Sequence, residues 1–178
     1  MSEIENILTK VKSGMAKTNL FIVNIPFLDL GTLLEFRAKG AQLPSSELGA
    51  LEIPHRGRRI KVPGQRSFTD WTITVMETKE MKVRILLEKW MELLNGASSN
   101  SINTSITKSV TVRPIYFDSN NAISQTANSP FIMTLEGAFP TNISAIEFSF
   151  DEQTAPLEYQ VTFSYAYHTM TSSNDSGI

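Results

Sequence analysis

A strict two-residue alternation near the C-terminal end constrains the fold of this chain more than any other feature. From Tyr159 to Tyr167 every second residue is apolar or aromatic, and three of the four residues between them are polar. Side chains of a β-strand point alternately to the two faces of a sheet. A strand with one apolar and one polar face is typical of an antiparallel sheet that covers a core on one side. The sequence therefore predicts a mainly β protein.

Six further segments have the composition or the alternation that is typical of strands. In residues 67–76, for example, Trp71, Ile73 and Val75 share one face, and mostly polar residues share the other. Gly137 and Pro140 predict that one of these strands breaks near its end. The predicted strands are residues 19–27, 33–44, 67–76, 109–117, 130–140 and 144–150, followed by the alternating segment itself, residues 157–168.

One long segment has the period of an amphipathic helix. Residues 78–94 carry an apolar stripe at helical spacing, and the dipeptide Asn95-Gly96 marks the end of this helix. A second, short helix is predicted for residues 1–14, and a polar, flexible tail for residues 169–178. The stripe of the long helix consists of Val83, Leu86, Leu87, Trp90, Leu93 and Leu94.

These elements predict an antiparallel β-sandwich or barrel-like domain with one packed α-helix and a long loop between two strands. A chain of 178 residues can bury a substantial core in one domain. Its content of 41% hydrophobic and 19% charged residues is ordinary for a globular protein. We therefore expect residues 1–178 to form a single domain.

The predicted long loop is strongly basic. It covers residues 44–64 and includes two short segments of strand-like composition, residues 50–53 and 59–62. No acidic residue occurs between Glu52 and Asp70. The positive charges in and next to this loop are Arg56, Arg58, Arg59, Lys61 and Arg66.

Charge is divided unevenly along the chain, although the net charge is only −2. All 16 basic residues lie at or before Arg113, together with 11 acidic residues. The remaining 65 residues hold seven acidic residues and no basic one. A chain with one basic and one acidic surface is suited to binding copies of itself head to tail.

No catalytic or metal-binding pattern is present in the sequence. The chain has no cysteine, and its two histidines, His55 and His168, are in no recognisable ligand spacing. It has no phosphate-binding glycine loop, no dinucleotide fingerprint and no serine nucleophile elbow. The acid pair Asp151 and Glu152 is interpreted as part of a solvated turn. We therefore predict a protein that is not an enzyme, with no catalytic residue, no metal and no cofactor.

The sequence also contains no membrane or export signal that we recognise. No run approaches 18 apolar residues, and the first 14 residues lack the apolar centre of a signal peptide. We therefore expect an intracellular protein without a membrane anchor.

Three interpretations of the basic loop remain open at this point. Its charges could simply be solvated, they could neutralise nucleic-acid phosphates, or they could dock on an acidic protein surface. A pI near 5.7 and the lack of aromatic residues among these charges both argue against a nucleic-acid-binding module. The uneven distribution of charge favours docking on protein.

Three blocks of the sequence together resemble a known family. They are "TNLFIVNI" followed by "RAKGAQLP", then "RRIKVPGQRSFTDWTITVM" from Arg58 to Met76, and "GAFPTNISAIEFSFDEQTAPLEYQVTFSYAYH" from Gly137 to His168. In this order and spacing they resemble the tail tube proteins of T-even-like, contractile-tailed bacteriophages. The resemblance runs from about Thr18 to His168.

The resemblance implies a structural virion protein. In that family six copies form a ring, strands of all copies join into an inner β-barrel, and rings stack into a hollow tube. A contractile sheath surrounds the tube, baseplate and tube-initiator proteins begin it, and DNA passes through the lumen without specific binding. It implies assembly in the host cytoplasm and a final place in the virion tail. Alternatives within the class are a tube-initiator or tube-terminator paralogue and a tube subunit of a bacterial contractile injection or secretion system.

The same resemblance implies that the basic loop reaches the neighbouring ring. We expect its charges to dock on acidic groups there, where each exposed ion pair would contribute roughly 0–1 kcal/mol and would mainly set register. The acid-rich last third of the chain could supply these groups or could face the lumen. The predicted interface residues are Arg56, Arg58, Arg59 and Lys61 on one side and Asp151, Glu152 and Glu158 on the other.

Overall fold

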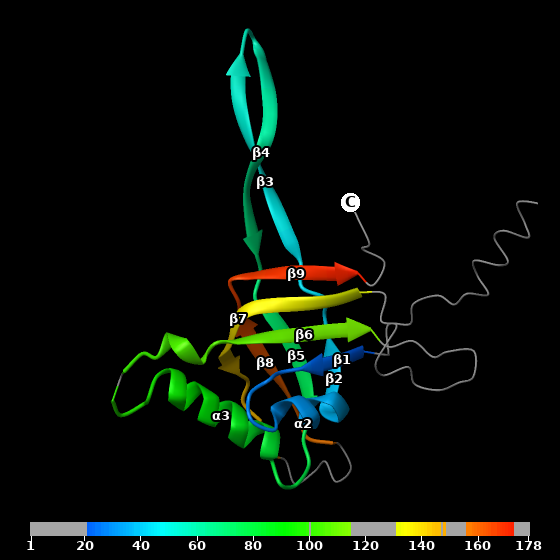
Figure 1. The fold of residues 1–178 in the computed structure, drawn as a ribbon, viewed down its shortest axis with the longest axis vertical. Coiled ribbons are helices and arrows are strands. Elements are labelled where there is room, and N and C mark those ends of the chain that lie inside the picture. The colour runs from blue at the N-terminus through cyan, green and yellow to red at the C-terminus, as the bar shows by residue number, and fades with distance from the viewer. Residues whose placement is uncertain (1–20, 100, 115–130, 147, 149–155, 173–178) are drawn as a thin grey trace, which may run out of the picture.

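Strands dominate the computed structural model of the protein (Figure 1). The structure describes residues 21–99, 101–114, 131–146, 148 and 156–172. The mainly antiparallel β architecture predicted from the sequence is confirmed. The helix predicted for residues 1–14 lies outside the described residues.

Seven strands form two four-stranded layers that share one strand. The first layer has the order β1–β6–β7–β9, and the second has the order β7–β8–β5–β2, with every neighbouring pair antiparallel. The bounds are β1 (Phe21–Asn24), β2 (Ala38–Ala41), β5 (Trp71–Met76), β6 (Lys108–Pro114), β7 (Phe131–Ile143), β8 (Glu158–Ser164) and β9 (Tyr167–Ser172).

Strand β7 does not break where the sequence predicts. It continues through Gly137 and Pro140 to Ile143, but it exchanges partners along its length. It pairs with β6 as far as Ala138 and with β8 from Phe139 onward. Gly137 has a φ of 68° at this exchange, a backbone conformation that glycine adopts without the steric cost of a Cβ atom. The predicted break is therefore wrong, and the glycine instead lets one strand serve two layers.

The last predicted strand is two strands. Strand β8 ends at Ser164, the chain bends at Tyr165 and Ala166, and β9 then pairs with the first half of β7. The predicted alternation holds from Tyr159 to Tyr165, where every second side chain is buried in the core. Tyr167, by contrast, is 50% exposed. The predicted tail of residues 169–178 is also wrong in part, because β9 includes Thr169–Ser172. Ladder hydrogen bonds with β7 hold this segment.

A short helix occupies part of the segment 33–44, for which the sequence predicts a strand. Helix α2 (Leu30–Arg37) precedes β2, and its Leu30 and Leu34 are fully buried. These leucines are four residues apart and lie on one helix face, so burying them together favours the helix over an extended chain. In the segment 144–150, the described residues Ser144–Ile146 and Phe148 are not in a strand.

Helix α3 (Lys82–Leu94) supplies the other side of the core, as predicted. Its Val83, Leu87 and Trp90 are fully buried, whereas Leu93 is 45% exposed. The Trp90 ring lies 4.9 Å from the Phe27 ring and 6.1 Å from the Phe163 ring. The indole nitrogen of Trp90 donates a hydrogen bond to the carbonyl of Ile106, in the 3₁₀ turn η1 (Thr104–Ile106).

A buried carboxylate fixes the start of α3. Glu77 accepts hydrogen bonds from the Arg84 backbone nitrogen at 2.7 Å and from the Tyr159 hydroxyl at 3.0 Å. Arg37 lies 3.4 Å from the same carboxylate, whose side chain is fully buried. This capping from outside the helix explains why α3 begins four residues after the predicted start at Thr78. Burial, together with the Glu77 charge, raises the pKa of the Tyr159 phenol.

We expect Phe163→Ala to lower the free energy of unfolding of the unassembled subunit by about 3–5 kcal/mol, the usual cost of truncating a buried aromatic ring. Phe163 is fully buried and contacts the rings of both Trp71 and Trp90. Urea unfolding followed by tryptophan fluorescence measures the change. Gln160→Ala, on the exposed face of the same strand, is the control and should stay within about 0.5 kcal/mol. Equal effects of the two substitutions would contradict the assignment of the core.

Candidate assembly surface

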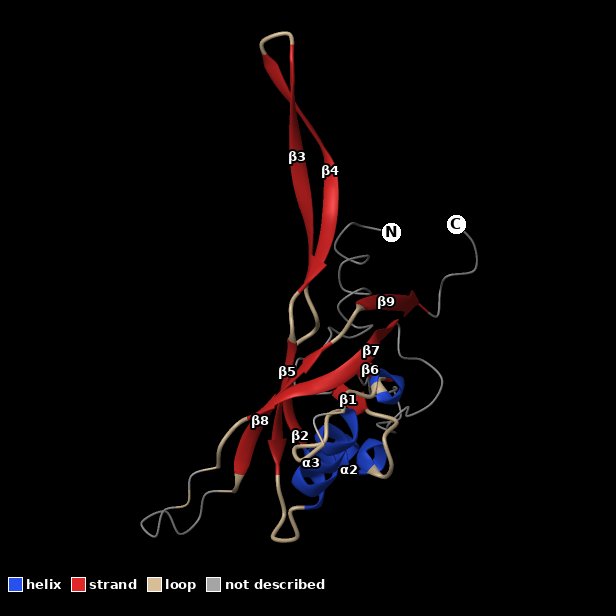
Figure 2. Ribbon diagram, turned by 90° about the vertical axis from the view of Figure 1, so that its left-hand side faces the viewer, coloured by secondary structure: helices blue, strands red, loops and turns tan. Residues whose placement is uncertain are grey.

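The predicted basic loop is a long β-hairpin that projects from the body (Figures 1 and 2). Strands β3 (Ser46–His55) and β4 (Arg58–Phe68) pair along their whole length and form a separate two-stranded sheet. We call residues 46–68 the arm. A ten-residue strand spans roughly 33 Å, so the arm tip lies far from the core. The prediction of a loop with two short β pieces is therefore wrong, since continuous cross-strand pairing joins those pieces.

The arm ends in a two-residue turn formed by Arg56 and Gly57. Both residues have positive φ, 45° for Arg56 and 76° for Gly57. Two consecutive left-handed residues are the signature of the type I′ turn, whose twist matches that of the strands it joins. The turn therefore places Arg56 at the tip and Arg58 at the first position of the returning strand.

One face of the arm is apolar and exposed. Leu51 lies opposite Val62, and Ile53 lies opposite Ile60, so that these four side chains share one face. Leu51 is 59% exposed, Ile53 46% and Ile60 49%. These exposed apolar side chains lie next to one another and form one apolar patch on the arm.

The other face of the arm carries a small charge network. Glu52 lies opposite Lys61, and its carboxylate is 3.1 Å from the Arg59 guanidinium and 3.7 Å from the Lys61 ammonium. Two of the four predicted docking charges are thus paired within the arm. Among the described residues, Arg56 and Arg58 at the tip have no ion pair. The sequence does not predict this role of Glu52, because its partners lie seven and nine residues further along the chain.

The structure does not bring the predicted acidic partners to the arm. Asp151 and Glu152 lie outside the described residues. Glu158 begins β8 and lies opposite Met76, at the end of β5 that is distant from the arm. Its carboxylate is 2.6 Å from the Lys39 ammonium. Within one subunit, Glu158 therefore neutralises Lys39 and not the arm.

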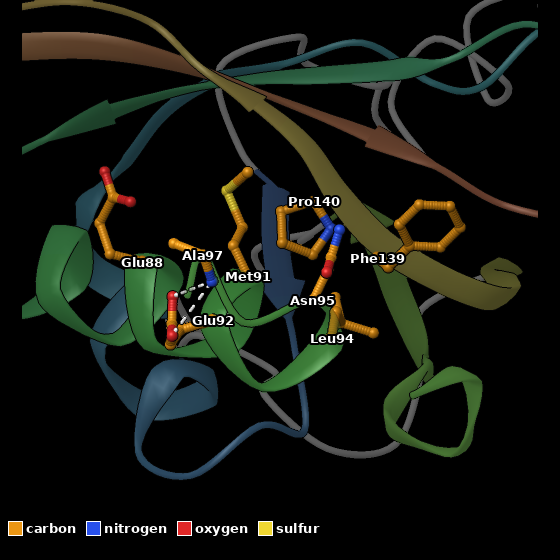
Figure 3. A pocket seen from close by; sticks show the side chains of 8 residues that line it. All are labelled: Glu88, Met91, Glu92, Leu94, Asn95, Ala97, Phe139 and Pro140. Atoms are coloured by element: carbon orange, nitrogen blue, oxygen red, sulfur yellow. Dashed lines mark hydrogen bonds between the residues drawn. The ribbon is translucent and has the colours of Figure 1, made fainter. Parts of the chain in front are cut away.

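A hollow of about 400 Å³ lies between α3 and the second half of β7 (Figure 3). Apolar side chains and two carboxylates surround it. The sequence does not predict this hollow, because Phe139 and Pro140 lie more than 40 residues after the end of α3 and only the fold brings them together. Its lining residues are Glu88, Met91, Glu92, Leu94, Asn95, Ala97, Phe139 and Pro140.

The two histidines lie in different surroundings. His55 is the last residue of β3, next to the arm tip, and is exposed. The His168 ring contacts the Phe68 ring at 5.0 Å, where the arm joins the body. Within the described residues, no group of three histidine, aspartate or glutamate side chains is placed to hold a metal ion. No described helix has the length and apolar character needed to cross a membrane.

Comparison with known proteins identifies relatives of this chain in sequence and in fold. The chain is 26% identical over 169 residues to the tail tube protein gp19 of Enterobacteria phage T4. The match covers 92% of this chain and 98% of gp19. A chain of the anti-feeding prophage baseplate has a similar fold, with a TM-score of 0.63 at 13% identity over 90% of this chain and 98% of that one. A chain from the sheath-tube complex of an extracellular contractile injection system has a TM-score of 0.60 at 14% identity. This match covers 97% of this chain and 99% of that one.

The fold is similar to that of chains in two contractile injection assemblies. The model of the phage tail tube protein family matches residues 10–171, and the chain belongs to this family.

We expect Arg56→Asn to stiffen the arm tip, because asparagine adopts the left-handed conformation at a lower cost than arginine. The amides of β3 and β4 should exchange with solvent roughly 2- to 5-fold more slowly in hydrogen-exchange mass spectrometry. Gly57→Val places a β-branched residue at positive φ and should accelerate exchange in the same peptides. Unchanged exchange in both variants would contradict the turn assignment.

Proposed function

We propose that this structural tail tube protein is the repeating subunit of the inner tube of a contractile phage tail. Six copies form a ring, rings stack head to tail, and DNA passes through the lumen without being bound specifically. The match to nearly the full length of T4 gp19 supports a repeating subunit over a longer initiator or terminator paralogue. We further propose that the chain assembles in the host cytoplasm and becomes part of the virion.

The observation that carries the proposal is the exposed apolar face of the arm. Leu51, Ile53 and Ile60 would remain in water in an isolated subunit, and a two-stranded hairpin is marginally stable without further packing. Stacking rings would cover this face. Most of the free energy of docking should then come from apolar burial, at roughly 25 cal/mol per Å² removed from water.

The basic side chains of the arm have a separate role in this proposal. Arg59 and Lys61 hold the two strands in register around Glu52, whereas Arg56 and Arg58 at the tip meet acidic groups of the next ring. Asp151, Glu152 and Glu158 remain proposed acceptors. Glu158 is the weakest of the three, because Lys39 already compensates its charge.

The sheath and the baseplate are proposed as further partners. One structure of similar fold is part of a sheath-tube complex and another is part of a baseplate. A nucleic-acid-binding module is less well supported, because Glu52 neutralises part of the basic face of the arm.

Negative-stain electron microscopy of the purified protein, alone and with a baseplate seed, tests the proposal. Sixfold rings or hollow tubes are expected. Particles that stay monomeric in both conditions would contradict the assignment as the repeating subunit. Retention on a DNA column that weakens steeply with salt, without any tubes, would instead favour the nucleic-acid-binding module.

We expect Ile53→Asp to abolish stacking while the subunit stays folded, because it places a charge in the apolar face that is to be buried. Sedimentation velocity would then show subunits or single rings in place of tubes. Ile53→Val keeps the face apolar and serves as the matched control. Tubes of normal length from the aspartate variant would show that the apolar face is not an interface.

We expect the double variant Arg58→Glu, Arg59→Glu to shorten tubes at low salt, since it reverses the charge next to the tip and removes a partner of Glu52. Raising the salt concentration should reduce the difference from the unsubstituted protein, because exposed charges are screened. Tube lengths counted in micrographs at two salt concentrations measure this. Equal lengths at low salt would remove these arginines from the interface.

A further inference from the structure

We propose that the hollow between α3 and β7 is the site that receives the arm tip of a neighbouring copy. This inference rests on the proposed stacking of subunits and names the surface onto which the arm docks. The arm tip and the hollow match in position, in apolar character and in charge.

The arm and α3 lie at opposite ends of the molecule. In Figures 1 and 2 the arm extends from one end, and α3 lies toward the other. A contact between two different patches at opposite ends of the folded subunit is heterologous. Repeating this contact adds copies in one direction and does not close a dimer. This is the geometry that stacking requires.

The hollow has an apolar lining. Met91, Leu94, Phe139 and Pro140 line it together, with α3 on one side and β7 on the other (Figure 3). A volume of about 400 Å³ admits a few side chains but not a whole strand. The tip of a narrow hairpin with isoleucines on one face fits this restriction. Ile53 and Ile60 are the exposed apolar pair nearest to the turn.

The rim of the hollow is acidic where the arm tip is basic. The Glu92 carboxylate accepts a hydrogen bond from the backbone nitrogen of Ala97 at 3.1 Å, and among the described residues no cation pairs with it. Glu88 pairs with Arg84 at 2.9 Å, and its side chain stays 54% exposed. Arg58 is likewise without an ion pair among the described residues. Docking would bring the basic tip to Glu92 and would fix its orientation.

Disulfide trapping tests this contact directly, because the natural chain has no cysteine. The variant Ile53→Cys, Met91→Cys carries one thiol on the arm and one in the hollow. If the arm of each copy enters the hollow of the next, oxidised tubes should give a ladder of cross-linked chains on a non-reducing gel. The control variant Ile53→Cys, Ile85→Cys has its second thiol on α3 outside the hollow, at a residue that is 59% exposed.

The gel and the micrographs separate the possible outcomes. A ladder from the Met91→Cys variant alone supports docking in the hollow. Tubes that form but give no ladder, or that give one only with Ile85→Cys, would overturn the hollow as the docking site and leave the proposed stacking intact. Absence of tubes from the unsubstituted protein would instead contradict the proposed function.

A charge exchange gives an independent test that does not depend on cross-linking. Arg58→Glu alone and Glu92→Arg alone should each raise the protein concentration needed for assembly by about tenfold, which corresponds to 1.4 kcal/mol. The double variant should restore assembly. Glu80→Arg, at an exposed acid outside the hollow, is the control and should have little effect. Normal assembly of the Glu92→Arg variant would overturn the proposal.

Discussion

The shared strand β7 is the constraint on which the rest of the structure depends. Because its first half pairs with β6 and β9 and its second half with β8, the two layers are tied together by one continuous backbone. Gly137 makes the exchange possible through its positive φ. The second half of β7 then presents Phe139 and Pro140 beside α3. One backbone adjustment therefore shapes both the core and the hollow at its edge.

The body and the arm are stabilised in different ways. In the body, Trp71, Trp90 and Phe163 pack together with apolar side chains from both layers and both α-helices of the described chain. The arm has no such core. Its order comes from strand pairing, a type I′ turn and the ion pairs of Glu52 with Arg59 and Lys61. A segment of this kind can stay ordered while its apolar face is exposed. This property suits the proposed role of the arm in binding another copy.

The charges of the arm divide by position. Arg59 and Lys61 on β4 pair with the Glu52 carboxylate, whereas Arg56 and Arg58 at the tip have no ion pair among the described residues. Part of the positive charge of the arm is therefore compensated within the arm itself. Burial of the apolar face would supply affinity, and the charges at the tip would supply orientation.

The sequence by itself determined the mainly β class, the core faces of β5 and β8, helix α3 and the family. These depend on local periodicity or on short blocks in a fixed order. Only the tertiary structure decided that Leu30–Arg37 is a helix, that β7 spans both layers, and that the basic segment is a hairpin with an apolar face. Pairing register and partner exchange depend on residues far apart in the chain, and the hollow exists only where α3 meets β7. Local patterns carry no information about such contacts.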